Sequence, residues 1–151
     1  MAKSYYSIVL DHSAEDIWAV IRLFDHYAWA GVESETIIED GNAGDQIGAV
    51  RRVTSGGKVL RQVLLAHSDI ERSYSYAFCG TPPMPIEDYR ATIRVTPVVA
   101  DGRSFVEWWA TFDCAADERA KWVRHLEQEG FARWLAALRD FMRRARAPIE
   151  A

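Results

Sequence analysis

The sequence lacks several features that would assign a protein to a class at once. Only two of its 151 residues are cysteines, Cys79 and Cys114, and neither has further ligands at metal-binding spacing. We therefore interpret both as reduced packing residues and expect no metal and no cofactor. No stretch approaches the roughly 18 consecutive apolar residues of a membrane span, and the first residues lack the apolar segment of a signal peptide. We expect a cytoplasmic protein without a membrane span.

Neither acidic nor basic residues strongly predominate. The formal net charge is -4, and the charged residues are scattered along the chain. The one basic cluster lies near the end and comprises Arg139, Arg143, Arg144 and Arg146. We interpret it as the solvated end of a helix, where cations complement the helix dipole. No nucleic-acid partner is expected from such a pattern.

Catalytic motifs are missing as well. The chain contains no Gly-x-Ser-x-Gly, no phosphate loop and no dinucleotide fingerprint. Its four histidines are far in sequence from any second candidate, and we expect them at the surface: His12, His26, His67 and His125. In a regular strand His67 would lie on the face opposite Gln62. The sequence therefore assigns no catalytic residue.

What the chain does contain is apolar and β-rich. With 49% hydrophobic and 12% aromatic residues, it suits a single domain, residues 1–151, with a sizeable core. Alternating apolar and polar residues predict seven strands. They cover Tyr5 to Asp11, Val32 to Glu39, Gln46 to Val53, Val59 to Ala66, Arg72 to Phe78, Tyr89 to Val95, and Phe105 to Phe112. Ser55-Gly-Gly57 is a hairpin signal.

Two short helices are expected after the first strand, and a long one closes the chain. Ser13 should cap the first helix by accepting from the backbone N–H of Asp16, and Asp25 should cap the second. The long helix should run from about Asp117 to Arg146. Gly130 interrupts it at a cost of roughly 1 kcal/mol relative to alanine, which indicates a kink or a close approach. Its apolar face comprises Phe131, Trp134, Leu135, Leu138, Phe141 and Met142.

Alternation also predicts which strand residues face the long helix, because residues two apart share one face of a sheet. The inward sets are Tyr74, Tyr76 and Phe78; Tyr89, Ala91, Ile93 and Val95; Val106, Trp108, Ala110 and Phe112; Ala49, Arg51 and Val53, with Ile47; and Gln62, Leu64 and Ala66. Trp109 is then left on the outer face. We expect it to mark an edge strand or a contact in a homodimer.

Several segments, in this order, carry a resemblance to a known superfamily. They are Ile17 to Asp25, Gly48 to Arg52, Leu60 to Leu64, Tyr74 to Tyr76, Pro85 to Thr92, and Val106 to Trp108 with Phe112. The chain resembles the helix-grip superfamily (SRPBCC) of START lipid-transfer domains, birch-pollen allergens, plant abscisic acid receptors and bacterial polyketide cyclase/dehydrase-like proteins. The resemblance implies an α+β helix-grip fold, a curved seven-stranded antiparallel sheet around the C-terminal helix. Gln62 stands where many members have glutamate, and Ala28 lies roughly where the hormone receptors carry a lysine, which disfavours a receptor role.

The resemblance also implies a ligand site between the sheet and the helix. Its candidate residues are Arg51, Gln62, Tyr76, Tyr89, Trp108, Phe112 and Trp134. Two other interpretations remain open at this point. Arg51 and Gln62 would satisfy each other's hydrogen bonds even without a ligand. Trp108 and Trp134 suit a filled core as well as an open pocket.

Two functions from different classes fit this pattern. The first is a module that binds or carries a small hydrophobic ligand, with access through the loops Ser55 to Lys58 and Gly80 to Pro85. The second is a polyketide cyclase/dehydratase-like enzyme in which Arg51 and Tyr89 polarise a carbonyl. A titratable group with a shifted pKa in the cavity would favour the enzyme. The sequence favours the binding module.

Overall fold

The computed structural model describes residues 1–31 and 35–145. Within these residues, seven strands form one antiparallel sheet in the order β1-β7-β6-β5-β4-β3-β2. The strands are β1 (Ala2–Leu10), β2 (Glu35–Ile38), β3 (Val50–Ser55), β4 (Lys58–Ser68), β5 (Ser73–Phe78), β6 (Glu87–Val98) and β7 (Arg103–Asp113). From β3 to β7 each strand pairs with the one before it in the chain, so β2 to β7 form a meander, and β1 pairs with β7 at its far end.

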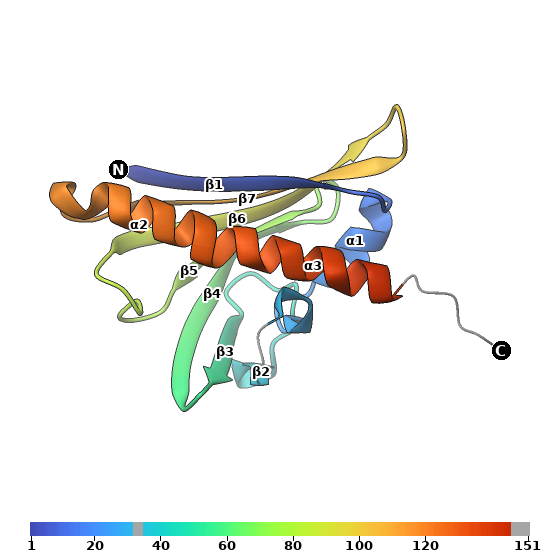
Figure 1. Ribbon diagram of the computed structural model, residues 1–151. Helices are drawn as coiled ribbons and strands as arrows, with labels where there is room; N and C mark the ends of the chain where they lie inside the picture. Colours follow the sequence, from blue (N-terminus) through green and yellow to red (C-terminus); the bar gives the residue numbers. More distant parts are fainter. Residues whose placement is uncertain (32–34, 146–151) are drawn as a thin grey trace.

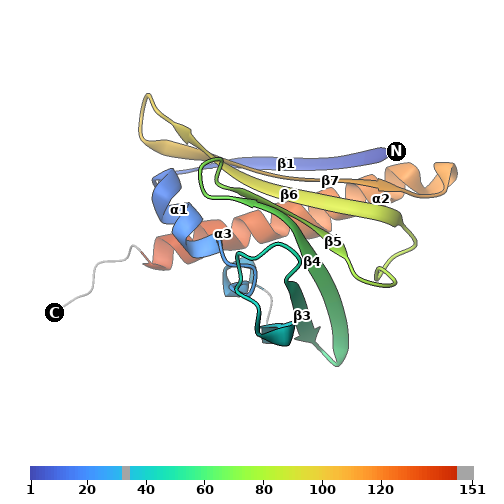
Figure 2. The same ribbon diagram turned by 180° about the vertical axis from the view of Figure 1, so that it is seen from behind.

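The helices lie on one side of this sheet. They are α1 (Ala14–Ile21), η1 (Ala28–Ala30), η2 (Glu39–Gly41), η3 (Ala116–Glu118), α2 (Arg119–His125), η4 (Leu126–Phe131) and α3 (Ala132–Ala145). Figures 1 and 2 show α2, η4 and α3 as one long helix crossing a strongly curved sheet. The α+β helix-grip fold expected from the sequence is confirmed.

The inward faces of the central strands also agree with the alternation. In β6 and β7 the apolar residues predicted to face inward are all at most 5% exposed. Tyr74 and Tyr76 of β5 are each 1% exposed, and Phe78 at the end of that strand is half-buried. The core therefore lies between this face and the C-terminal helix, where apolar burial supplies the main stabilisation.

A β-bulge in β4 overturns two of the predicted positions. The pairing of β4 with β5 shifts between Leu64 and Ala66, so one extra residue enters the strand. Beyond the bulge the alternation is reversed: Ala66 is exposed, and His67 pairs with the inward-facing Tyr74. The His67 side chain is only 8% exposed and packs on Trp18, with their ring centroids 5.4 Å apart. The prediction of a surface histidine was wrong here.

Three further expectations are corrected by the structure. His12 is also buried, at 8% exposure, where its carbonyl oxygen accepts a 2.6 Å hydrogen bond from Ser104. Asp25 caps no helix, because η1 begins later, with Tyr27 at its N-cap. Trp109 does not mark an edge strand, since β7 lies between β1 and β6; its indole is half-buried and stacks on Tyr5.

Two predicted strands are shorter than expected. The strand placed over Gln46 to Val53 begins only at Val50, because the chain turns at Gly48, whose φ of +89° favours glycine. Ile47 is consequently 56% exposed rather than inward-facing. In the strand placed over Val32 to Glu39, the structure has β2 at Glu35–Ile38, and residues 32–34 lie outside the described residues.

The C-terminal helix contains a π-helical turn at η4, and Gly130 lies within it. Gly130 is buried, and a Cβ atom at this position would lie 3.4 Å from the indole of Trp134. This is an ordinary van der Waals distance, so the close approach expected at Gly130 is not found, and the residue lies instead in an irregular turn of the helix. The π turn inserts one residue into the helix, so the side chains on either side of it do not follow one continuous helical stripe.

Removing the cap of α1 tests how the first helix is held. The Ser13 hydroxyl accepts from the backbone N–H of Asp16 at 3.1 Å, as the sequence predicts. Ser13→Ala should lower the free energy of unfolding by about 1 kcal/mol, because one N-terminal N–H loses its acceptor. Urea denaturation followed by circular dichroism measures this, and Ser13→Asp, which restores an acceptor, is the control. Equal stability of the alanine and aspartate variants would contradict the capping role.

Candidate functional site: a pocket between sheet and helix

One pocket opens between the β3–β4 hairpin, the β5–β6 loop and the C-terminal helix. Its volume is about 370 Å³, within the range of small-molecule sites. The lining residues are Tyr27, Val53, Ser55, Lys58, Val59, Leu60, Gln62, Phe78, Pro83, Met84, Tyr89, Leu126 and Trp134. Both loops expected at the cavity mouth, Ser55 to Lys58 and Gly80 to Pro85, contribute to this lining.

Most of the pocket wall is apolar. At the rim, Ser55 and Lys58 belong to the hairpin turn and are exposed. Deeper in, the polar side chains are Tyr27, Gln62 and Tyr89, which are 7%, 5% and 5% exposed. A ligand would thus meet an apolar wall with a few hydrogen-bonding groups at its inner end.

Arg51 lies directly behind Gln62 in the wall of the pocket. The two residues are partners across β3 and β4, and Arg51 Nε donates to Gln62 Oε1 at 2.7 Å. Arg51 Nη1 donates to the carbonyl oxygen of Phe24 at 3.2 Å. The sequence thus predicted both the inward position of Arg51 and its contact with Gln62.

The Arg51 guanidinium is surrounded by aromatic rings. Its Cζ lies 4.1 Å from the ring centroid of Phe24, 4.3 Å from that of Tyr27 and 5.0 Å from that of Tyr76. Cation–π attraction of this kind favours a desolvated guanidinium. The residue is nevertheless 0% exposed, and Nη2 has no hydrogen-bond partner within the described part of the chain.

Four tyrosines surround this cation, and burial raises their pKa values. Desolvation raises the pKa of Tyr27 to about 12, although the positive charge of Arg51 opposes the shift. Desolvation is also the main cause that raises the pKa values of Tyr74, Tyr76 and Tyr89. The pKa of Tyr76 is raised well above its ordinary value. All four hydroxyls therefore remain protonated at neutral pH and can donate hydrogen bonds.

The structure brings only part of the predicted site to the pocket surface. Gln62, Tyr89 and Trp134 line the pocket, while Arg51 and Tyr76 form a layer behind it. Trp108 and Phe112 are each 0% exposed and do not line this pocket.

Trp108 belongs to the packed core. Its ring centroid lies 5.7 Å from that of Trp29, 5.4 Å from that of Phe131 and 5.1 Å from that of Trp134. Its Nε1 donates to the Tyr76 hydroxyl at 3.2 Å. Trp108 therefore fills the core, whereas Trp134 lines the open pocket.

Sequence reasoning missed four lining residues, the first being Val59, which directly follows the predicted hairpin turn and is 58% exposed. Tyr27 lies in the irregular segment between α1 and η1, where no periodicity indicates a facing direction. Leu126 precedes the apolar helix face that was predicted, because the π turn interrupts the helical repeat. Leu60 shares the inward face of β4 with Gln62, and strand alternation alone would have found it.

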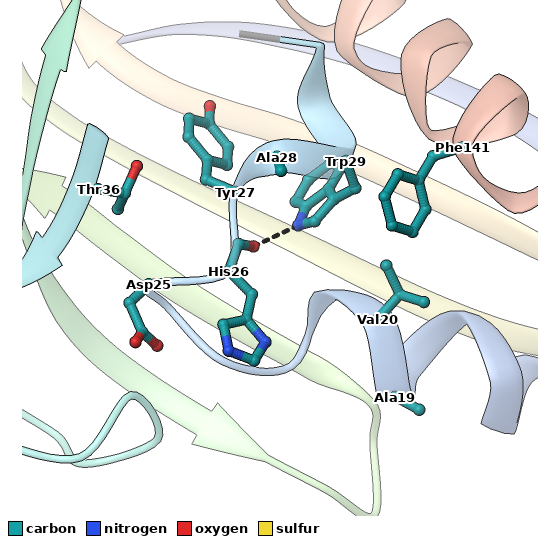
Figure 3. Close-up of a pocket in the computed structure, with 9 residues that line it drawn as sticks. All are labelled: Ala19, Val20, Asp25, His26, Tyr27, Ala28, Trp29, Thr36 and Phe141. Atoms are coloured by element: carbon teal, nitrogen blue, oxygen red, sulfur yellow. Dashed lines mark hydrogen bonds between the residues drawn. The ribbon is translucent and has the colours of Figure 1, made fainter. Parts of the chain in front are cut away.

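A second hollow lies on the other side of Tyr27, between α1, η1 and α3 (Figure 3). It has a volume of about 480 Å³, and its lining includes Val20, His26, Trp29 and Phe141. In this region Trp29 Nε1 donates to the carbonyl oxygen of His26 at 2.6 Å (Figure 3). The His26 side chain is exposed, and no buried charged group is among the lining residues. We therefore place the candidate site in the pocket beside Gln62.

The described part of the chain contains neither a cluster of metal ligands nor a membrane-spanning helix. No group of three or more metal-ligating side chains is found among residues 1–31 and 35–145. No helix in the same ranges has both the length and the apolar character needed to cross a bilayer.

Comparison with known proteins gives a consistent family. The family described as "Polyketide cyclase / dehydrase and lipid transport" matches residues 1–150. No curated protein matches the chain. A solved structure from Nitrosospira multiformis is 29% identical, with a TM-score of 0.78 over 91% of this chain and 94% of that chain. One from Thermobifida fusca is 27% identical, with a TM-score of 0.83 over 99% of both chains.

The same fold occurs at lower identity in a protein from the BE-7585A biosynthetic pathway. The di-domain ARO/CYC BexL is 15% identical, with a TM-score of 0.80 over 98% of this chain and 48% of that chain. This likeness concerns the fold alone.

The buried tyrosines allow a test of the site's electrostatics. Because their folded-state pKa values are raised above 10, their contribution to stability is fully present below about pH 10. It is lost as the pH rises toward the folded-state values, since only the unfolded chain then releases the phenolic protons. Tyrosinate absorbance should therefore develop together with alkaline unfolding, and Tyr27→Phe should lower the number of protons released by one. Ionisation of these tyrosines near pH 10 in a still-folded protein would contradict their burial.

Proposed function

Because the chain belongs to the polyketide cyclase/dehydrase and lipid transport family, we propose that it binds a small hydrophobic molecule in the pocket between the sheet and the C-terminal helix. The observation that supports this is an apolar wall, formed by residues such as Leu60, Leu126 and Trp134, with Gln62 and Tyr89 at its inner end. Apolar surface supplies affinity in such sites, and a few polar groups orient the ligand. The ligand should accordingly be mainly apolar and carry an oxygen function at one end.

The candidate ligand-binding residues have different roles in this proposal. Gln62, Tyr89 and Trp134 contact the ligand directly. Arg51 lies behind Gln62 and donates to its side-chain oxygen at 2.7 Å. Tyr76, Trp108 and Phe112 support the pocket from the packed core, where each is at most 1% exposed.

A second candidate function is a cyclase or dehydratase acting on an aromatic or polyketide substrate. The observation that favours it is the set of buried tyrosines whose pKa values are raised, because Tyr89 lines the pocket and stays protonated. A protonated phenol in a desolvated site can donate a hydrogen bond to a substrate carbonyl as negative charge develops there. The fold of BexL is compatible with this role. Recovery of a bound compound chemically unchanged after prolonged incubation would favour the carrier, whereas its conversion would favour the enzyme.

Filling the pocket tests the binding function. Leu60 is half-buried in the pocket wall on β4, so Leu60→Trp should occupy part of the 370 Å³ and reduce ligand affinity at least about tenfold. The control is Val63→Trp, which places the same ring on the opposite face of the same strand. Native mass spectrometry of gently purified protein identifies retained compounds, and calorimetric titration measures affinity. Equal retention by the two variants would exclude this pocket as the site.

Access to the pocket should depend on its two rim loops. The hairpin turn at Ser55 to Lys58 contains Gly56 and Gly57, both with positive φ, and Pro83 and Met84 of the opposite loop line the same pocket. We expect fast amide hydrogen exchange in both loops and slower exchange when a ligand is bound. The Asp101-Gly102 turn between β6 and β7, which does not line the pocket, is the control. Unchanged exchange in the rim loops on ligand binding would contradict a role in access.

A further inference from the structure

Arg51 has a full positive charge in the core, and no negative partner for it is found among residues 1–31 and 35–145. No carboxylate in these ranges lies within ion-pair distance of its guanidinium, whereas Arg22 and Arg61, for example, do form ion pairs. Its hydrogen-bond acceptors, Gln62 Oε1 and the Phe24 carbonyl oxygen, are neutral, as is the Tyr74 hydroxyl that also interacts with it. Burying an unpaired charge is costly, so such a group is normally compensated by an anion.

The groups that face Arg51 do not supply that anion. Phe24, Tyr27 and Tyr76 enclose the guanidinium. The Tyr74 hydroxyl makes a hydrogen-bonding contact with it, and Tyr89 lies close enough to interact with its charge. Burial raises the pKa values of these tyrosines, so they are neutral over the physiological range. These neutral groups therefore leave the positive charge of Arg51 uncompensated, and an anionic group of a ligand could pair with it.

The hydrogen-bonding capacity of Arg51 is also incomplete. Its Nη2 is buried and has no partner in the described structure. A guanidinium is a planar fork whose N–H groups match the two oxygens of a carboxylate, and this pairing is about twice as strong as one between neutral groups. A carboxylate would supply both the missing acceptor and the missing charge.

A route from the pocket to Arg51 passes through two neutral side chains. Gln62 lines the pocket and holds Arg51 Nε with its amide oxygen, and Tyr27 lines the pocket while its ring packs on the guanidinium. If the Gln62 amide rotated away, a ligand carboxylate could replace its oxygen as the acceptor for Arg51 Nε. The charge thus lies one side chain behind the inner end of the pocket.

We infer that the pocket selects hydrophobic molecules that carry a carboxylate, and that Arg51 is the residue that recognises this group. This inference rests on the proposed binding function and narrows its ligand to an acid. Lys58 is the other cation at the pocket, but it is exposed at the rim, where water weakens an ion pair. Arg51 should therefore dominate the selectivity.

The test compares acids with their uncharged isosteres. Octanoic, decanoic, dodecanoic and naphthylacetic acids, each beside its primary amide, are titrated calorimetrically into the native protein. The acids should bind about 10- to 100-fold more tightly than the amides, as expected for a charge-assisted pair in a desolvated site. Three variants localise the effect. Arg51→Met should abolish the preference, whereas Lys58→Met and the outward-facing Arg52→Met should keep it.

A measurement on the native protein makes the test independent of how well the variants fold. Arginine stays charged at all accessible pH values, so the affinity for the acids should fall only as their own carboxyl groups are protonated, at about pH 4 to 5, while the amides show no such change. Equal affinities for acids and amides would overturn the inference and leave the proposed binding function intact. Retention of the acid preference in Arg51→Met, or its loss in Lys58→Met, would also overturn it. Failure of both acids and amides to bind would count against the proposed function itself.

Discussion

Trp108 joins the two halves of this fold. It lies on β7, the strand beside the edge strand β1, and its indole packs on Phe131 and Trp134 of the C-terminal helix and on Trp29 of η1. Buried aromatic clusters of this size contribute both apolar area and directional ring contacts. Because Trp108 also donates to the Tyr76 hydroxyl, it holds the inner layer of the site in place. The distance between sheet and helix, and hence the room left for a pocket, depends on this contact.

The π turn is what gives the helix two different surfaces. Before the turn, α2 contains no fully buried residue; after it, Leu135, Leu138 and Met142 enter the core. The Trp134 indole lies over the turn, where a Cβ atom at Gly130 would be in ordinary van der Waals contact with it. Leu126 and Trp134 can therefore both reach the pocket from opposite ends of the turn. π turns of this kind frequently occur at functional sites.

Much of the fold was predictable because strand alternation and helix periodicity are properties of local sequence. The inward faces of β6 and β7 follow strict period-two patterns, and the contact of Arg51 with Gln62 follows from a hairpin with a recognisable turn. The bulge at Leu65 was not predictable, because a single additional residue leaves no mark on composition yet reverses the facing of Ala66 and His67.

The candidate site was predictable only in part. Which inward residues reach an open pocket depends on how side chains from distant segments fill the space, and Trp108 and Trp134 differ in this respect although both are inward-facing tryptophans. Tyr27 has no periodic neighbours from which its direction could be inferred. That Arg51 has no acidic neighbour within the described part of the chain is likewise a property of the assembled core, since acidic residues are common in the sequence.

The two edge strands of the sheet, β1 and β2, have different surroundings. These surroundings affect whether the sheet can pair with another chain at high protein concentration. Along β1 the C-terminal helix packs beside the strand, and the Ser4 hydroxyl donates to the carbonyl oxygen of Val123 at 2.9 Å. At the opposite edge, β2 ends at Ile38, where η2 begins, and it carries the exposed Glu35. Covering helices, interruptions and charged side chains all make an edge strand a poor template for pairing with another chain. The architecture that leaves room for a pocket thus also disfavours growth of the open sheet by strand addition.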